Sequence, residues 1–363
     1  ISNQPVTTST NIHAVNENAA GLAKIHWEAV NHLIVRPITV GLRQIKLSCC
    51  AGAVVFPQQV NKHIEVMRCA ETALGQAKQD KASMLRMFDE SILEEIDRIQ
   101  KLEKMLEHAI DNNKEIFAVY QPKVDAKGNL IGAEALARWI NQELGFVSPA
   151  EFIPVAEAAG LIDKFGMWMV NTVCKQINSW RDAGFEVPSR IAINFSALQL
   201  MKADFVLNLV QIVKSHNIDP AQIEIELTES GLLTNINDCI AKLNSLRDVG
   251  FTIALDDFGT GYSSLSYLKD LPLDVLKIDR SFVNDLDTTT TKGLARSIID
   301  IGHNMSLDIV AEGVEEREQV TTLEEMGCEI FQGYYFAKPM SSDDFLAWAK
   351  ALVASTVLAE QIK

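Results

Sequence analysis

Two adjacent carboxylates, Asp256 and Asp257, directly follow the short apolar run Phe251–Leu255. The run is typical of a buried strand, and successive side chains of a regular strand point to opposite faces of the sheet. We therefore expect the strand to end with the apolar run, so that both carboxylates can face one ligand. Two such carboxylates repel each other and resist desolvation, and divalent cations beside them would stabilise the pair. The alternative is an Asx turn with a helix cap, since Gly259 and Gly261 follow closely.

Further polar side chains stand at the ends of other apolar segments: Glu134, Asn194, Glu226, Lys277, Glu312 and Gln332. Each alone could cap a helix or solvate a rim, but together they would form a site if the fold gathers these ends. Carboxylate and amide oxygens without His or Cys favour Mg²⁺ or Mn²⁺. Several carboxylates that share a site with one lysine fit two-metal hydrolysis of a phosphodiester. A carboxylate pair that cleaves sugars is the alternative, although the crowding of acids favours cations.

The segments that carry these side chains alternate between strand and helix patterns. The predicted strands cover residues 116–121, 129–135, 190–195, 222–227, 251–255, 274–278, 307–311 and 329–331. Helices are predicted at 150–159, 166–183, 203–216, 236–249 and 291–304. This alternation predicts an α/β fold, a closed (β/α)8 barrel, in which the carboxyl ends of the strands share one rim. The first connection, 122–128, is short enough for a hairpin, so we expect the first two strands to be antiparallel.

The chain before the barrel has a different pattern. A helix over 23–36, a strand over 44–56 and a helix over 60–79 predict a small α/β module. From Leu85 to Ile110 apolar residues recur every three or four positions, which predicts one long amphipathic helix. This helix either packs on its own domain or acts as a coiled-coil signalling helix. The predicted organisation is a front module at 1–82, a linking helix at 83–112, a barrel at 113–352 and a C-terminal tail at 353–363.

The overall composition limits the partners and the compartment. The 363 residues carry a formal net charge of −15, which argues against broad binding of DNA or RNA, because affinity for phosphates needs clustered Lys and Arg. Six cysteines without a C-x-x-C pair indicate a reducing, cytoplasmic setting. No apolar run is long enough to span a membrane. Because the chain begins at Ile1, we expect a fragment, which could be the cytoplasmic part of a larger, membrane-tethered protein.

The motifs around the polar residues closely resemble those of EAL-domain cyclic di-GMP phosphodiesterases. The matching segments are GAEALARW (132–139), INFSALQL (193–200), ELTES (226–230), DDFGTGYSSLSYL (256–268), LKIDRSFV (276–283), AEGVE (311–315) and QGYYFAKP (332–339). The resemblance implies a TIM-like barrel with an antiparallel first strand. It also implies metal-dependent hydrolysis of cyclic di-GMP to linear pGpG with two Mg²⁺ or Mn²⁺ ions, and a homodimer formed through the barrel. The alternative is a receptor that binds cyclic di-GMP without cutting it, but receptors usually lose the metal set, which is complete here.

The resemblance further implies a role for each site residue. The implied metal ligands are Glu134, Asn194, Glu226 and Asp256 for one ion, with Asp256 and Asp257 for the second. The implied catalytic residues are Lys277 beside the attacking water, Glu312 as a further acid, and Glu229. The implied substrate contacts are Gln121, Leu136, Arg138, Gln332 and Glu315. Nearby carboxylates would raise the pKa of Lys277 and nearby metals would lower it. We therefore favour activation of the water by the metals, with Lys277 orienting it.

The loop Phe258–Ser264 is expected to act as a switch. It contains two glycines, two serines and a threonine, and it has too little apolar mass to hold one shape unaided. It also begins beside the acids that would place the second metal, so the order of the loop and metal occupancy should be linked. Glu229 could accept hydrogen bonds from the loop and pin it. The alternative for Glu229 is an acid in the first turn of a helix, favoured by the helix dipole.

The front module resembles a different family. The segments LSCCAGAVVFP (47–57) and AETALGQAKQDK (70–81) are similar to the C-terminal half of a GGDEF (diguanylate cyclase) domain. No GGDEF or GGEEF string occurs in the sequence, and residues 1–8, where it would lie, contain neither the glycines nor the acids. The resemblance therefore implies a partial, degenerate GGDEF-like module that is inactive as a cyclase and has a regulatory or packing role.

Overall fold

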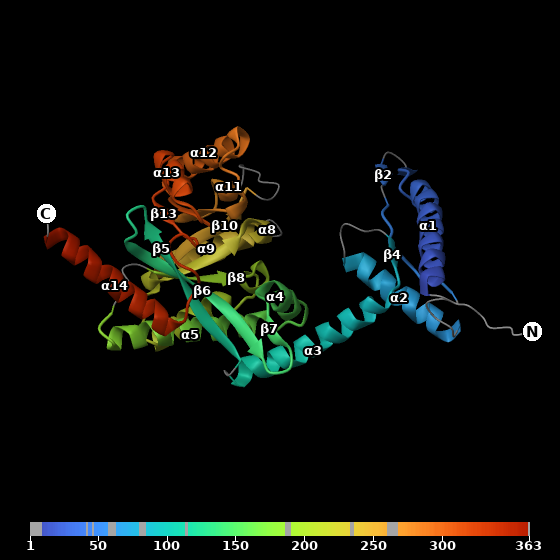
Figure 1. Cartoon of the computed structure of the whole chain (residues 1–363), viewed down its shortest axis with the longest axis horizontal. Coiled ribbons are helices and arrows are strands. Elements are labelled where there is room, and N and C mark those ends of the chain that lie inside the picture. Colours follow the sequence, from blue (N-terminus) through green and yellow to red (C-terminus); the bar gives the residue numbers. More distant parts are fainter. Residues whose placement is uncertain are drawn as a thin grey trace, which may run out of the picture. The chain divides into compact units, whose positions relative to one another are not determined.

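The computed structural model (Figure 1) describes residues 9–40, 43–45, 47–56, 63–79, 85–112, 115–185, 190–232, 236–259 and 268–361. The chain divides into two compact units, Ile1–Lys101 and Leu102–Lys363. Helix α3 (Glu90–Asn112) contributes residues to both units. Among the described residues, no helix combines the length and the apolar character needed to cross a membrane.

The first unit is a small α/β assembly around a short parallel strand pair. Its elements are α1 (Ser9–Ile34), β1 (Ile38–Val40), β2 (Arg43–Ile45), β3 (Ala51–Ala53), α2 (His63–Gln79), β4 (Leu85–Met87) and the start of α3. Strands β1 and β2 form an antiparallel pair, and β3 and β4 are parallel and connected through α2. Gly52 lets β3 approach α2 closely, because a Cβ atom there would lie 2.1 Å from the carbonyl oxygen of Ala70.

Two predictions for this unit were wrong. The predicted strand 44–56 is two strands, β2 and β3, which pair with different partners. An apolar run does not reveal where one strand ends and the next begins, because the pairing partners decide that. The helix predicted from Leu85 begins only at Glu90, since residues 85–87 form β4. Phe88 nevertheless packs with Cys69 and Ile92 in the core of the unit, so its apolar side chain fitted the helical spacing by coincidence.

The second unit is a closed eight-stranded barrel. Its strands are β5 (Ile116–Asp125), β6 (Leu130–Asn141), β8 (Ile191–Phe195), β9 (Ile223–Thr228), β10 (Thr252–Phe258), β11 (Val275–Ile278), β12 (Asp308–Ala311) and β13 (Ile330–Phe331). The sheet closes because β5 pairs with both β6 and β13, antiparallel in each case, while the other neighbouring barrel strands are parallel. A short strand that was not predicted, β7 (Gly145–Val147), extends the sheet beside β6. The predicted (β/α)8 barrel is thus confirmed.

Helices lie on the outside of the barrel (Figure 1). They are α4 (Pro149–Ala158), α5 (Ile162–Asp182), α6 (Ala197–Leu200), α7 (Phe205–Ser215), α8 (Glu229–Leu232), α9 (Ile236–Val249), α11 (Arg280–Asn284), α12 (Thr289–Asn304), α13 (Arg317–Glu325) and α14 (Ser342–Gln361), with a 3-10 turn at Pro220–Gln222. The five predicted helices correspond to α4, α5, α7, α9 and α12. The residues predicted as a tail, up to 361, continue α14.

Candidate active site

Four polar side chains from four different strands converge on one place: Glu134 on β6, Asn194 on β8, Glu226 on β9 and Lys277 on β11. They alternate with apolar neighbours, as the period of a strand requires. Asn194 and Glu226 stand opposite each other in the pairing of β8 with β9. Glu226 and Lys277 are fully buried. The barrel therefore brings these four predicted residues together, with Glu134, Glu226 and Lys277 buried and Asn194 exposed to solvent beside Glu134.

Lys277 lies at the centre of this cluster. Its Nζ atom is 2.6 Å from Glu312 Oε1, 2.8 Å from Glu226 Oε2, 3.1 Å from Asp256 Oδ2 and 3.9 Å from Glu134 Oε2. These acids come from β9, β10, β6 and the end of β12. One ammonium group is thus surrounded by four carboxylates, an excess of negative charge that suits additional cations.

Amide groups orient Glu134. The Asn194 Nδ2 atom donates to Glu134 Oε1 at 2.5 Å, and Gln332 Nε2 donates to Glu134 Oε2 at 2.6 Å. Gln332 Nε2 also lies 3.2 Å from Gln121 Oε1, and these two acceptors fix the orientation of the Gln332 amide. The Oε1 atom of Gln332 is buried and has no hydrogen-bond partner among the described residues. Such an oxygen is suited to accept a hydrogen bond from a ligand or a water molecule, or to bind a hard cation.

The carboxylates of the two adjacent aspartates lie close together because of an irregularity in β10 that the sequence did not reveal. The prediction that the strand ends at Leu255 was wrong, because β10 continues to Phe258. Its register against β11 shifts between Leu255 and Phe258, and Asp257 has a φ of 56°, in the left-handed region. This irregularity breaks the alternation of side chains. As a result, carboxylate oxygens of Asp256, Asp257 and Glu312 lie within 4.8 Å of one another, a spacing that fits a metal ion.

Glu229 connects the strand end to a neighbouring helix. It is the first residue of α8 and is almost completely buried. Its Oε2 atom accepts a hydrogen bond from the backbone N–H of Gly259 at 3.2 Å. Gly259 has a φ of 93° and directly follows β10. Residues 260–264 of the predicted switch loop lie outside the described residues, as do residues 1–8, where the GGDEF string would stand.

Burial and mutual charge set the protonation of the cluster. Burial, together with Glu226, raises the pKa of Glu134 to about 7, and burial raises the pKa of Glu312 to about 8. Burial also acts to raise the pKa of Glu226, but Lys123 and Lys277 outweigh it and bring this pKa to about 2. For Lys277, burial would lower the pKa, yet the surrounding carboxylates raise it well above its usual value. Lys277 is therefore an ammonium ion at neutral pH.

The remaining predicted substrate residues are Leu136, Arg138, Glu315 and Gln121. Glu134, Leu136 and Arg138 are alternate residues of β6 and so share one face of the strand. Leu136 and Arg138 are half-buried. Burial lowers the pKa of Arg138, while Tyr334 and Glu134 act to raise it, so its guanidinium lies within electrostatic reach of both.

Glu315, by contrast, is exposed. Its backbone N–H donates to Gln319 Oε1 at 2.7 Å, in the turn that leads into α13. Gln121 is buried on β5 and stands opposite Glu134 in the pairing of β5 with β6. Its Nε2 atom donates to the carbonyl oxygen of Ala337 at 3.2 Å.

Sequence reasoning missed two buried charges next to the cluster, Lys123 and Glu224. Lys123 Nζ lies 2.5 Å from Glu224 Oε1 and 2.8 Å from Glu226 Oε1. A signal was present, because Glu224 and Glu226 occupy alternate positions of an otherwise apolar strand. Two acids on the same face of a buried strand require cations nearby.

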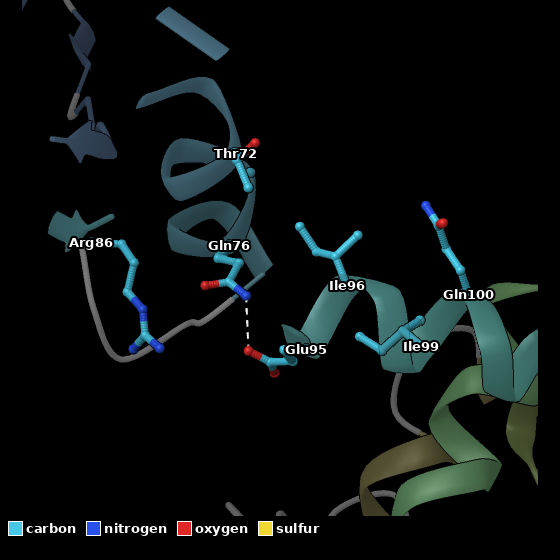
Figure 2. A pocket seen from close by; sticks show the side chains of 8 residues that line it. Thr72, Gln76, Arg86, Glu95, Ile96, Ile99 and Gln100 are labelled. Carbon is cyan, nitrogen blue, oxygen red and sulfur yellow. Dashed lines mark hydrogen bonds between the residues drawn. The ribbon is translucent and has the colours of Figure 1, made fainter. Parts of the chain in front are cut away.

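A separate cavity of about 590 Å³ lies in the first unit (Figure 2). Its lining residues are Thr72, Gly75, Gln76, Arg86, Glu95, Ile96, Ile99 and Gln100. Figure 2 shows the hydrogen bond from Gln76 Nε2 to Glu95 Oε2, which is 2.9 Å long. The cavity contains none of the predicted site residues.

The barrel part of the chain is similar to known proteins. The EAL domain family matches residues 103–339, more than half of the chain. The cyclic di-GMP phosphodiesterase PdeR of Escherichia coli is 34% identical over 86% of this chain. The bifunctional diguanylate cyclase/cyclic di-GMP phosphodiesterase MucR of Pseudomonas aeruginosa is also 34% identical over 86% of this chain. The chain spans only 47% and 46% of the lengths of these two relatives.

Among solved structures, the chain is similar to one described as the PaMucR phosphodiesterase in complex with c-di-GMP. The two share 37% sequence identity with a TM-score of 0.64, over 68% of this chain and 99% of that structure. The segment that the EAL domain family matches, residues 103–339, contains every residue of the cluster around Lys277. The fold, the cluster and the family match lead to one conclusion: this chain belongs to the EAL-domain family.

Proposed function

We propose that the barrel is a phosphodiesterase that hydrolyses cyclic di-GMP to linear pGpG. The observation that carries this proposal is the position of Lys277 Nζ within 4 Å of four carboxylates that come from separate strands. A buried cluster so rich in acids is suited to collect divalent cations and a phosphate. The two relatives whose names state activity on cyclic di-GMP, and the related structure in complex with c-di-GMP, support this choice of substrate.

The donor set fits two divalent cations, Mg²⁺ or Mn²⁺. We propose that Glu134, Asn194, Glu226 and Asp256 hold one ion and that Asp256 and Asp257 hold the second. The close approach of Asp256, Asp257 and Glu312 supports the second position. All of these donors are hard oxygen ligands. When bound, the ions would supply a Lewis acid at the phosphate and lower the pKa of the attacking water.

The protein residues would orient the reactants. Because its pKa is raised, Lys277 keeps its proton, so we assign it the orientation of the attacking water and the stabilisation of negative charge on the phosphate. We assign Glu312 to the same water and the second cation. The half-buried guanidinium of Arg138 would bind a phosphate oxygen of the substrate.

The substrate's bases and remaining polar groups would contact other residues of the rim. Leu136 offers an apolar surface for a guanine base, and Gln121 and Gln332 offer amide groups beside Glu134. The exposed carboxylate of Glu315 could accept hydrogen bonds from the N–H groups of a guanine. A homodimer through the barrel stays a prediction, which light scattering on the purified chain would test.

For the front module we propose a degenerate GGDEF-like unit that regulates the barrel and makes no cyclic di-GMP. The parallel β3–α2–β4 arrangement supports an α/β relationship, and the alignment with the bifunctional relative MucR is longer than the EAL match alone. Supplying GTP and Mg²⁺ should yield no cyclic di-GMP. Production of cyclic di-GMP by this chain would contradict the assignment.

The decisive experiment is incubation of the purified chain with cyclic di-GMP and Mg²⁺ or Mn²⁺, followed by chromatographic detection of pGpG. The Glu134→Ala variant should lose turnover and keep its fold, and an excess of EDTA should stop the wild type. Glu325→Ala, which removes an exposed acid of α13, is the matched control and should remain active. Undiminished pGpG production by Glu134→Ala would refute the proposal. Binding of cyclic di-GMP without any product would assign the chain to the receptor class instead.

A further inference from the structure

A line of alternating charges lies on the amino-terminal side of the Lys277 cluster. It begins at Lys123 on β5, whose Nζ atom lies between Glu226 Oε1 and Glu224 Oε1. The second oxygen of Glu224 lies 2.9 Å from Arg190 Nε, just before β8. Arg190 Nη2 in turn lies 2.6 Å from Asp308 Oδ2, at the start of β12. Lys123 and both glutamates are buried, whereas Arg190 and Asp308 reach solvent.

This arrangement clamps Glu226 between two ammonium groups. Its Oε1 atom lies 2.8 Å from Lys123, and its Oε2 atom lies 2.8 Å from Lys277. One lysine on each oxygen fixes the rotation of the carboxylate about its side-chain bond. Lys123 cannot move away, because Glu224 holds it at 2.5 Å and is itself held by Arg190.

We propose that Lys123 is a positioning residue for the metal ligand Glu226, and that Glu224 and Arg190 keep Lys123 in place. The inference rests on the proposed function in one respect, the assignment of Glu226 as a metal ligand. Lys123 does not touch the substrate in this proposal. It acts by holding one carboxylate in the orientation that binds the cation, as groups around metal ligands commonly do.

The sign of the effect distinguishes positioning from simple charge. Lys123 is a cation close to a cation site, so on charge alone its removal should strengthen metal binding. In the positioning role, removal should weaken metal binding. Without Lys123, Glu224 and Glu226 would repel each other on the same face of β9, and Glu226 would turn away from its binding orientation.

The experiment is calorimetric titration of the metal-free full chain with Mn²⁺, alongside measurement of pGpG formation. The variants are Lys123→Met and the double variant Lys123→Met/Glu224→Gln. The double variant also removes the charge of Glu224, which Lys123→Met would leave buried next to Glu226 with no lysine between the two carboxylates, so it keeps the test valid if Lys123→Met alone fails to fold. Lys164→Met, which removes an exposed lysine paired with Asp111, is the matched control.

The expected result is a Mn²⁺ dissociation constant raised about 10- to 100-fold in the double variant, with its circular dichroism spectrum unchanged. Its kcat should fall at a fixed Mn²⁺ concentration, with little change in KM for cyclic di-GMP. Mn²⁺ binding as tight as, or tighter than, that of the wild type in the folded double variant would overturn the inference.

The two proposals can fail separately. A wild-type chain that binds Mn²⁺ but releases no pGpG would refute the phosphodiesterase, while the calorimetric comparison would still decide the role of Lys123. A wild-type chain that forms pGpG, combined with normal Mn²⁺ binding by the double variant, would refute only the role of Lys123.

Discussion

Lys277 lies within 4 Å of four carboxylates of the cluster, whereas Lys123 contacts only Glu226 among them. Among the described residues, removal of Lys277 would leave only Lys123, on Glu226, as a cation next to these four carboxylates, and breaking a buried ion pair in this way typically costs about 3–5 kcal/mol. We therefore expect Lys277→Met to lower the melting temperature in EDTA clearly. Mn²⁺ should restore more stability to this variant than to the wild type, because bound cations would replace the lost charge.

The same variant should lose about 10²- to 10³-fold in the rate of pGpG formation, since a buried cation that stabilises developing negative charge is removed. Thermal unfolding with and without Mn²⁺, together with a rate assay, measures both effects. Lys164→Met should leave both properties unchanged. A Lys277→Met protein as stable in EDTA as the wild type would show that the carboxylates do not depend on this lysine.

At the scale of single elements, the hydrogen bond from Gly259 to Glu229 ties the end of β10 to the start of α8. Because β10 also carries Asp256 and Asp257, loosening this end should loosen the second metal position. We expect Glu229→Ala to keep its fold, to lose most phosphodiesterase activity, and to regain part of it at high Mg²⁺ or Mn²⁺ concentration.

Glu229→Gln is the matched control, because its side-chain oxygen can still accept the hydrogen bond from Gly259. It should retain more activity than Glu229→Ala at low metal concentration. The measurement is the dependence of the pGpG rate on metal concentration for the three proteins. An unchanged dependence in Glu229→Ala would leave Glu229 with only the role of a first-turn helix acid.

The start of α3 offers a second prediction at this scale. Asp89 stands immediately before the helix, and its Oδ1 atom accepts a hydrogen bond from the backbone N–H of Ser91 at 2.7 Å. Hydrogen bonds from Ser91 lower the pKa of Asp89. Loss of such a cap costs about 1 kcal/mol, so Asp89→Ala should speed hydrogen exchange in the first turn of α3 about fivefold at neutral pH.

The pH dependence has a defined sign. A carboxyl group whose pKa is lower in the folded state stabilises that state above its unfolded pKa, and the contribution is lost as the pH falls through the folded pKa. The difference between the wild type and Asp89→Ala should therefore shrink as the pH drops below about 4. Asp89→Asn can cap the helix without a charge, so its exchange at neutral pH should stay close to that of the wild type. Exchange in Asp89→Ala as slow as in the wild type would exclude a cap.

The sequence was informative where a side chain's role depends on a strand's own pattern. Glu134, Asn194, Glu226 and Lys277 stand in or at the ends of recognisable strands, so the barrel alone brings them together. The prediction was wrong for the end of β10, because the shifted register depends on pairing with β11 and not on the apolar run itself.

Lys123 shows a second limit of prediction from the local sequence pattern. It lies on the hairpin strand β5, beyond the predicted segment 116–121, and only the closure of the barrel places it against β9. Pairing between distant segments likewise determines the secondary structure of residues 85–87, which form a strand beside β3 instead of joining the helix. Local periodicity describes an element's own preference, while its partners settle its boundaries.

For the molecule as a whole, α3 is the element that the two units share. Its early residue Ile92 packs with Phe88, which precedes the helix, in the core of the first unit, whereas Leu102, Leu106 and Ile110 are buried in the core of the barrel unit. A chain that starts near residue 98 should therefore fold as a barrel. A chain that starts at residue 113 would lack these three buried side chains of α3, so we expect it to aggregate or to unfold at lower temperature.

Size-exclusion chromatography and thermal unfolding of the two truncated chains would check this expectation. The chain from residue 98 should retain phosphodiesterase activity, at a rate or in an oligomeric state that differs from the full chain if the front module is regulatory. Equal stability of the two truncated chains would mean that the barrel does not need α3.

The left-handed backbone conformation of Asp257 is expected to lower the stability of the metal-free protein while serving its activity. A side chain other than Gly at positive φ strains the backbone, and the pKa of Asp257 is raised by burial and by the neighbouring charge of Asp256. Asp257→Gly would relieve both the strain and the repulsion, so without metal we expect this variant to melt at a higher temperature than the wild type while losing turnover. A lower melting temperature in EDTA would disprove this. If the melting temperature and turnover change in these opposite directions, selection for thermal stability alone would favour Gly at position 257, whereas a bound cation would favour the aspartate.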